Sequence, residues 1–310
     1  MAPGRTFVAL ALLASVAGCA PAASPADPGT TGTPSPPPSG PPATSPATAP
    51  TGVPAMLLAV PTGLAVTAVA RPRERLAVRM PTGAWQPTAA VGRHGAILLV
   101  STAARSPATA VEGVLAGTQV RVGWSASLPA AVGPAVLAGC VAADGVAVVI
   151  ADRLVYLRAG RVAATHEVPA TAGRCQMTDD DAVAYLADVD HALTFWGPGA
   201  DTVVVTATRC DDLGLGGGLL ACLATGVDRV VVGRLLPPVA GRTAIDPASA
   251  QRLPGPARQV VLSPDGRWLA IAGSGAPAVR LYGRLAGDAF EAVGAFDLGT
   301  GEALLAFVEP

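Results

Sequence analysis

Four cysteines in the main body of the chain have the residue type and spacing needed for disulfide bonds. Cys210 precedes a glycine-rich loop and Cys222 follows it, and Gly216 is the midpoint between them. In an antiparallel hairpin that turns about Gly216, the two cysteines would lie directly opposite each other. Opposed residues have α-carbons about 4.5 to 5.5 Å apart, which is within disulfide range. We therefore predict a Cys210–Cys222 disulfide.

The other two cysteines, Cys140 and Cys175, occupy the same place in two successive repeat units of the chain, which are described below. Equivalent places would put them on neighbouring strands, so we predict a second disulfide between them. Two alternatives stay open from the sequence. Four cysteines allow three connectivities, and all four thiols could instead be buried as small apolar side chains.

A cluster of aspartates is the main candidate for metal binding. Calcium prefers several converging carboxylate oxygens, but these aspartates fall on two turns, where solvated side chains are the simpler interpretation. No two of the histidines, His94, His166 and His191, have the spacing of metal ligands. We therefore predict no metal site. The aspartates of the cluster are Asp179, Asp180, Asp181, Asp188 and Asp190, with His191 beside them.

Two short segments have part of the composition of a phosphate-binding or catalytic loop, without the rest. Residues 213–218 are rich in glycine, but they join two short strands instead of opening a helix, so a hairpin turn is favoured. Residues 123–127 contain Ser125 but lack the second glycine and the following helix of a nucleophile elbow. We predict no catalytic residue and no cofactor, and the sequence does not favour an enzyme.

Charge and aromatic residues give two weaker indications. The net charge of −1 argues against a general affinity for nucleic acid. Four closely spaced arginines could dock an anionic envelope polymer or a lipid head group, although a solvated loop is the favoured interpretation. The tryptophans are spaced about one for every one or two repeats, and we expect them to pack between repeats. The arginines are Arg71, Arg73, Arg75 and Arg79, and the tryptophans are Trp85, Trp124, Trp196 and Trp268.

The first 18 residues have the pattern of an export signal. Arg5 precedes an apolar core at 7–16, which is too short to span a membrane as a helix. The next residues, Val16-Ala17-Gly18-Cys19, resemble the lipobox of bacterial lipoproteins. That resemblance implies cleavage just before Cys19 and a lipid, with acyl chains such as palmitate, on its sulfur. Two acyl chains are enough for stable anchoring, so we expect an extracytoplasmic protein held to the cell membrane by lipid.

Residues 19–54, which follow the predicted signal peptide at 1–18, are rich in Pro, Ser and Thr. Such a composition cannot bury enough apolar surface to order itself. We expect a disordered tether that reaches at most roughly 100 Å, at about 3.1 Å per residue in polyproline II conformation. The folded domain is then expected over residues 55–310.

In residues 55–310 no helical periodicity is sustained, and short Val-, Leu- and Ala-rich runs alternate with Gly, Pro and Asp. This pattern predicts many short strands and an all-β fold. Units of strand, turn, strand, loop and strand begin roughly 35, 35 and 50 residues apart, a period typical of a β-propeller. The expected strands include 63–70, 75–80, 96–101, 146–151, 154–157, 182–187, 192–196, 219–224, 230–233, 267–273 and 279–283.

One unit, VVLSPDGRWLAIAG at 260–273, closely resembles the repeat of WD-repeat-like propellers, with Ser263-Pro264-Asp265-Gly266 as its turn. The resemblance implies a propeller, and counting units gives six blades, with seven as an alternative. We expect residues 302–308 to pair with the strand near Met56, because ring closure removes exposed sheet edges. A β-sandwich and two smaller β domains are the alternative folds. The uncharged segment 124–143 could be taken for a membrane span, but its prolines and glycines argue against that interpretation.

A propeller hosts many unrelated activities, so the fold alone does not select a function. Because no coherent catalytic set is present, we expect a monomeric, membrane-anchored binding or scaffolding module that recognises an envelope protein or polymer. A small-ligand sensor and a hydrolase- or lactonase-like enzyme are the alternatives. Several carboxylates and a histidine meeting at one end of the channel would favour the enzyme, and one deep apolar pocket would favour the sensor.

Overall fold

The structure is a computed structural model that describes residues 55–308, apart from several short segments. The predicted signal peptide, Cys19 and the tether lie outside the described residues. So do His94, His191, Trp85 and all five aspartates of the acidic cluster. The segments that are not described are 82–85, 92–94, 102–108, 129–135, 142–144, 151, 169–174, 179–181, 187–191, 199–200, 225–228, 274–277 and 285–288.

The described residues form strands joined by turns and contain no α-helix, so none of them lies in a helix able to cross a membrane. The predicted strands at 96–101, 192–196 and 219–224 have the expected bounds, whereas the one at 75–80 shrinks to two residues. The segment 124–143 contains the end of one strand and the whole of the next, which agrees with its rejection as a membrane span. The strands are β1 (Ala55–Val60), β2 (Gly63–Ala68), β3 (Leu76–Ala77), β4 (Gln86–Val91), β5 (Ala96–Ser101), β6 (Thr109–Ala116), β7 (Gln119–Ser127), β8 (Val136–Val141), β9 (Val146–Ile150), β10 (Arg153–Arg158), β11 (Arg161–Glu167), β12 (Cys175–Met177), β13 (Val183–Leu186), β14 (Ala192–Trp196), β15 (Val203–Gly216), β16 (Leu219–Ala224), β17 (Val230–Arg234), β18 (Arg242–Thr243), β19 (Gln251–Leu253), β20 (Gln259–Leu262), β21 (Trp268–Ala272), β22 (Val279–Arg284), β23 (Phe290–Phe296) and β24 (Ala303–Val308).

The strands form five sheets. Four have four strands each, in the orders β24-β1-β2-β3, β4-β5-β6-β7, β8-β9-β10-β11 and β20-β21-β22-β23. The fifth has eight strands, with β12, β13, β14, β15, β16, β17 and β19 in sequence and β18 attached to β15. The predicted count of six or seven separate blades is therefore corrected to four separate four-stranded blades and one eight-stranded sheet. The reason is β15, which runs unbroken through two of the predicted units.

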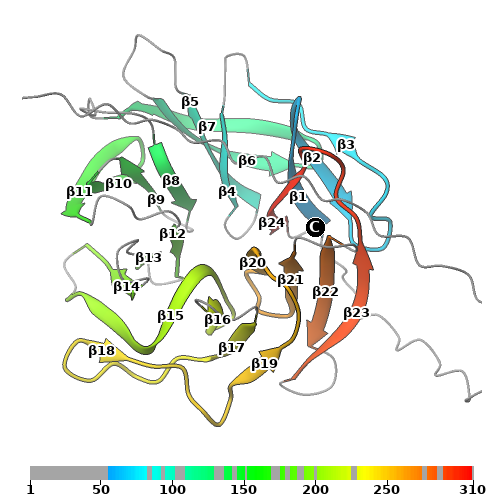
Figure 1. The fold of residues 1–310 in the computed structure, drawn as a ribbon. Helices are drawn as coiled ribbons and strands as arrows, with labels where there is room; N and C mark the ends of the chain where they lie inside the picture. The colour runs from blue at the N-terminus through cyan, green and yellow to red at the C-terminus, as the bar shows by residue number, and fades with distance from the viewer. Residues whose placement is uncertain are drawn as a thin grey trace, which may run out of the picture. The chain divides into compact units, whose positions relative to one another are not determined.

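Within the folded part, the sheets follow one another around a ring (Figure 1). The innermost strands contact each other in the order β24, β4, β8, β12, β15 and β20, and β20 then contacts β24. The first half of β15 pairs with β14, and its second half pairs with β16. Therefore β15 serves as the outer strand of one four-stranded set and as the inner strand of the next.

The ring closes where the last strand meets the first. β24 pairs with β1 in antiparallel register, with Met56 opposite Phe307 and Ala55 opposite Val308. The predicted pairing of the C-terminal run with the strand near Met56 is confirmed. The chain end thus supplies the innermost strand of a sheet whose other strands come from the start of the domain.

Apolar side chains fill the space between adjacent sheets. In β9 the pattern is buried throughout, since Val146, Val148 and Ile150 pack toward one neighbouring sheet while Ala147 and Val149 pack toward the other. A strand covered on both faces is apolar without alternation, which explains the uninterrupted apolar runs of the sequence. Trp196 and Trp268 lie in such layers, and Trp124 packs against another, as predicted.

Candidate functional site

Both predicted disulfides are present in the structure. Cys140 on β8 is bonded to Cys175 on β12, with α-carbons 5.6 Å apart. These are the innermost strands of two successive sheets, as the repeat alignment predicted. Both cysteines are buried, so the bond ties two sheets together close to the axis of the ring.

The second disulfide joins Cys210 to Cys222 within the β15–β16 hairpin, with α-carbons 5.4 Å apart. The predicted register is wrong, although the pairing is right. Cys222 lies opposite Leu213, and Cys210 lies opposite Ala224, because a bulge between 210 and 212 shifts the ladder. The hairpin also turns at Gly217 and Gly218, not at Gly216. The bond therefore crosses the ladder diagonally at the bulge.

Polar side chains of the innermost strands bridge to the next strand of the ring. The Gln176 side-chain amide on β12 donates to the Leu213 carbonyl at 3.3 Å and accepts from the Leu215 amide on β15. Further round, Gln259 on β20 donates to the Leu304 carbonyl on β24. Gln176 thus links two innermost strands of the eight-stranded sheet, and Gln259 links two separate sheets.

Asp212 makes the equivalent bridge between β15 and β20. The carboxylate is buried, and its Oδ2 accepts from the Val260 amide at 2.7 Å. At the outer side of the same two sheets, Gln251 donates to and accepts from the main chain of Phe290 at 2.7 Å. A buried carboxylate needs such donors, and here one is supplied by the neighbouring sheet. Sequence reasoning missed these bridges, since nothing local distinguishes the residues that make them.

The glycine-rich loop and the Ser263-Pro264-Asp265-Gly266 turn lie against each other. The Gly217 amide donates to the Pro264 carbonyl at 2.9 Å. A Cβ on Gly216 would collide with the Ser263 carbonyl, and Gly217 and Gly218 have φ of 55° and 74°. The loop is a hairpin turn, as predicted. Its glycines are required by the close approach of a neighbouring turn as well as by positive φ.

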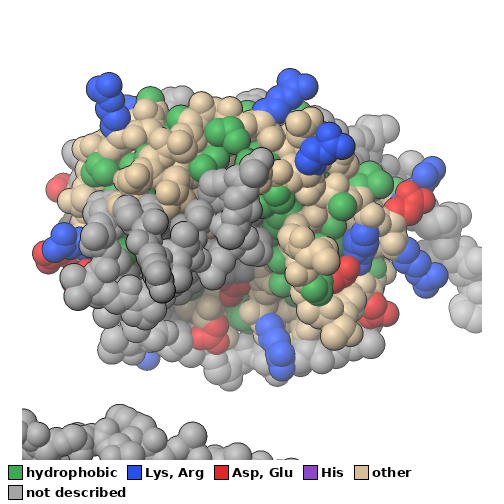
Figure 2. Space-filling model, turned by 90° about the horizontal axis from the view of Figure 1, so that it is seen from above, with side chains coloured by type: hydrophobic (Ala, Val, Ile, Leu, Met, Phe, Trp, Pro, Cys, Tyr) green, Lys and Arg blue, Asp and Glu red, His purple; other side chains and the backbone are tan. Residues whose placement is uncertain are grey.

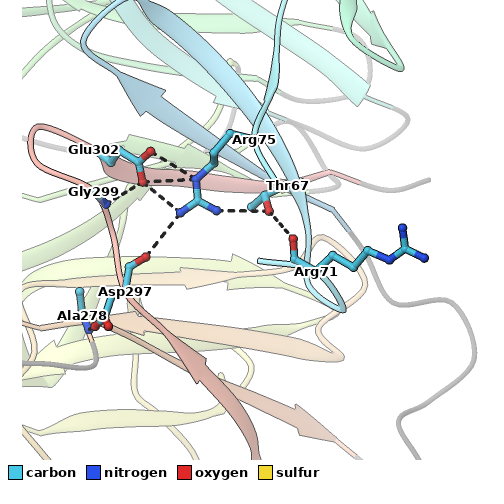
Figure 3. A network of polar contacts seen from close by, with 7 residues as sticks. All are labelled: Thr67, Arg71, Arg75, Ala278, Asp297, Gly299 and Glu302. Atoms are coloured by element: carbon cyan, nitrogen blue, oxygen red, sulfur yellow. Dashed lines mark hydrogen bonds and ion pairs between the residues drawn. The ribbon is translucent and has the colours of Figure 1, made fainter. Parts of the chain in front are cut away.

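The predicted basic patch is divided by the structure, because Arg75 points into a polar network (Figure 3). Its guanidinium lies 3.0 Å from the Glu302 carboxylate. It also donates to Thr67 Oγ1 and to the Asp297 carbonyl, both at 3.4 Å, and lies 5.8 Å from the Phe296 ring centroid. Arg75 therefore links the β2–β3 connection to the β23–β24 connection, where the ring closes.

Arg75 and its neighbours also shift the pKa of Glu302. Hydrogen bonds from Arg75 lower this pKa most, and the Gly299 amide, which donates to Oε2 at 2.8 Å, lowers it further against the effect of burial. The side chains of Arg75 and Glu302 are 22% and 14% exposed, whereas those of the neighbouring pair Arg71–Glu74 are 72% and 63% exposed. On the face drawn in Figure 2, basic side chains stand apart and are not gathered in one patch.

His166 joins the two sheets that carry the Cys140–Cys175 bond. Its ring stacks on Trp196 at 4.9 Å between centroids, and Nε2 lies 3.2 Å from the Tyr185 hydroxyl. Burial lowers the pKa of His166, partly offset by Glu167. The sequence predicted neither of these partners of His166. Among the described residues, no group of three or more His, Cys, Asp or Glu could hold a metal ion.

One exposed element was missed by sequence reasoning: a hairpin at residues 235–245, called the 235–245 arm below. It leaves the sheet after β17, and its β18 pairs in parallel with Val204 and Val205 of β15. The sequence signal for the arm was the spacing of the repeat units, which grows from roughly 35 to roughly 50 residues at this point.

Ser125 and Ser127 lie exposed on strand β7, as expected for surface serines.

No protein-family model and no curated protein matches the chain. The fold is similar to that of a functionally unknown protein from Desulfotomaculum acetoxidans, with a TM-score of 0.54, 10% identity and coverage of 79% of this chain and 80% of that chain. It is also similar to a putative 6-phosphogluconolactonase from Bacteroides uniformis, with a TM-score of 0.52, 10% identity and coverage of 80% and 84%.

Hsv2 from Kluyveromyces lactis is similar with a TM-score of 0.46 and 12% identity, and the chain covers 62% of its length. For that comparison 67% of this chain is matched. It is the closed ring of sheets that gives the chain a propeller fold. Identities this low say nothing about activity, so what this propeller does must be argued from its own residues.

Proposed function

We propose that this protein is a lipid-anchored, extracytoplasmic binding or scaffolding module built on a propeller of degenerate WD-repeat type. The observation that carries the proposal is the pair of buried disulfides, Cys140–Cys175 and Cys210–Cys222. Structural disulfides are formed in oxidising compartments and are rare in the reducing cytosol. The lipobox-like Val16-Ala17-Gly18-Cys19 independently predicts the same side of the membrane.

We further propose that the eight-stranded sheet fills two successive positions of the ring. The closed order of innermost strands, β24, β4, β8, β12, β15 and β20, supports this arrangement. In it β12 and β15 of the eight-stranded sheet both line the axis. We propose three parts of the chain: a signal peptide at 1–18, an anchored tether at 19–54 and a monomeric propeller domain at 55–310.

The polar residues described near the axis support a binding module over a hydrolase. Gln176, Asp212 and Gln259 are each engaged with the main chain of the next innermost strand. Groups used in this way hold the ring rigid, and a rigid ring of loops is a suitable frame for recognising a protein or an envelope polymer. We regard the partner as extracytoplasmic, because the proposed anchor faces that compartment.

The anchoring is tested by Cys19→Ala in cells. The native protein is expected in the membrane fraction with its signal removed, and to incorporate labelled palmitate. Cys19→Ala should incorporate no label, and should appear in the medium or as uncleaved precursor. A double Cys210→Ala/Cys222→Ala variant is the control for effects of a lost cysteine, and it should stay membrane-bound. Normal processing and membrane retention of Cys19→Ala would contradict the proposal.

A further inference from the structure

The 235–245 arm carries the most exposed large apolar side chain among the described residues. Val239 is 75% exposed and Leu236 is 43% exposed, and Val204 beside them on β15 is 36% exposed. The residues from 236 to 240 read Leu-Pro-Pro-Val-Ala, and all five are exposed. Single exposed apolar residues are ordinary, but a contiguous exposed apolar run marks an interaction surface.

The tip of the arm is held in one conformation by its own backbone. Val239 and Arg242 exchange hydrogen bonds of 2.8 and 3.1 Å around a two-residue turn. In that turn Ala240 and Gly241 have φ of 50° and 72°, the combination of a type I′ hairpin turn. Ala240 is one of only two non-glycine residues with positive φ in the described part of the chain. This conformation costs free energy for a residue that has a Cβ.

The base of the arm is fixed to two strands. Thr243 is buried, and its hydroxyl donates to the Leu236 carbonyl at 2.6 Å. Thr206 on β15 donates to the Thr243 carbonyl at 3.0 Å. Ile245 is buried, and its side chain lies so close to Gly233 on β17 that there is no room for a Cβ at that position. A rigid base keeps the apolar tip presented to the outside, and little conformational entropy is lost when the tip binds.

We propose that the tip of the 235–245 arm docks into the interface of a lipid bilayer. Stable protein partners need about 20 to 30 residues a side, whereas a bilayer accepts a small apolar wedge. The exposed Arg242 lies at the tip opposite Val239, which suits anionic head groups. This proposal uses the proposed Cys19 anchor only to bring the domain to a membrane.

The point at which the tether enters the domain favours a membrane as the binding partner of the arm. β1 begins at Ala55, which lies opposite Val308 at the end of innermost strand β24. β17 ends at Arg234, opposite Leu219, beside the turn at the end of innermost strand β15. Innermost strands run in the same direction around a propeller, so the arm and the start of the domain lie at the same end of the ring. The tether therefore enters the domain at the arm's end of the ring, and by keeping the domain near the membrane it raises the effective concentration of a weak wedge.

The test uses residues 20–310, which lack the predicted signal peptide and lipidated cysteine but keep every described residue. Flotation with vesicles of phosphatidylcholine and phosphatidylglycerol in equal parts should show binding, weaker with phosphatidylcholine alone. Val239→Asp should lower the affinity for the mixed vesicles by about tenfold, the value expected for losing one buried valine. The matched control is Val162→Asp, because Val162 is 48% exposed on outer strand β11, and it should bind as the native chain does.

A fluorescent variant reports the location of the tip. Val239→Trp should show a blue shift of tryptophan emission when mixed vesicles are added, and Val162→Trp should not. If the native chain ignores both vesicle types, or if both aspartate variants lose binding equally, the arm is not a membrane wedge. Either result leaves the anchoring proposal intact, since that depends on Cys19 in cells.

Discussion

Two junctions of the ring are held in different ways. At the junction of β8 and β12, a buried disulfide joins Cys140 to Cys175, which are 35 residues apart in sequence. At the junction of the first and last sheets, the bridge between Arg75 and Glu302 spans 227 residues and consists of an ion pair and hydrogen bonds. The first junction joins successive units, and the second joins the first and last described strands. The comparison teaches that the disulfide bond itself is indifferent to pH, whereas the bridge at the closing junction depends on an ionised carboxylate.

The largest expected effect is on the covalent junction. Replacing both Cys140 and Cys175 by alanine should lower the free energy of unfolding by about 4 kcal/mol, since the bond closes a 35-residue loop. The Cys210→Ala/Cys222→Ala variant should lose about 3 kcal/mol, because its loop is 12 residues. Urea unfolding measures both. Equal or reversed losses would show that loop length does not set the difference.

At the closing junction, Glu302→Gln should lower the free energy of unfolding by about 2 kcal/mol, because it leaves the half-buried Arg75 without its charged partner. Arg71→Ala, which breaks the exposed pair with Glu74, is the matched control and should cost less than about 0.5 kcal/mol.

The same variant tests the pH dependence of the closure. The pKa of Glu302 is lowered below its ordinary 4.5 in the folded protein, so its contribution is complete above pH 4.5 and is lost as the pH falls through the folded-state value. Urea unfolding between pH 7 and pH 3 should therefore show a decline that Glu302→Gln reduces. An unchanged decline would mean that other carboxyls control acid stability.

The smallest expected effect returns to the covalent junction, where His166 also crosses between the two sheets. Burial lowers its pKa below 6.5, so the unfolded chain takes up the proton first, and stability falls as the pH drops below 6.5. His166→Gln should remove this decline, which we expect to be below about 1 kcal/mol for a half-buried ring. Urea unfolding between pH 8 and pH 5 measures this decline in the free energy of unfolding. A decline as large as the one predicted for Glu302 would show that the two junctions do not differ in their dependence on pH.

The sequence predicts the strands well, because a strand covered on both faces is an uninterrupted apolar run, and runs such as AILLVS and LLACLA are bounded by turn residues. It also predicts the Cys140–Cys175 disulfide, because repeated units occupy equivalent places. The Cys210–Cys222 disulfide follows from the hairpin between the two cysteines, and the closing strand follows from the removal of exposed sheet edges. The predicted register of Cys210 and Cys222 was wrong, because a bulge between Cys210 and Asp212 inserts an extra residue that the hairpin symmetry did not include.

The parts of the candidate site that escape the sequence are contacts between sheets. Gln176, Asp212 and Gln259 look like ordinary polar residues of short strands, and only the ring places a main-chain partner opposite each one. The same holds for Arg75, whose neighbours Arg71, Arg73 and Arg79 suggested a surface patch. Its role is fixed by Glu302, which lies too far along the chain for any local pattern to reveal the pair.

The position of β24 has a consequence for how the protein is made. The innermost strand of the first sheet comes from residues 303–308, which are synthesised, and would cross a membrane, after every other described strand. Until they arrive, β1 has a bare edge and the ring stays open. A chain threaded through an export channel therefore cannot adopt its final shape before these residues have emerged.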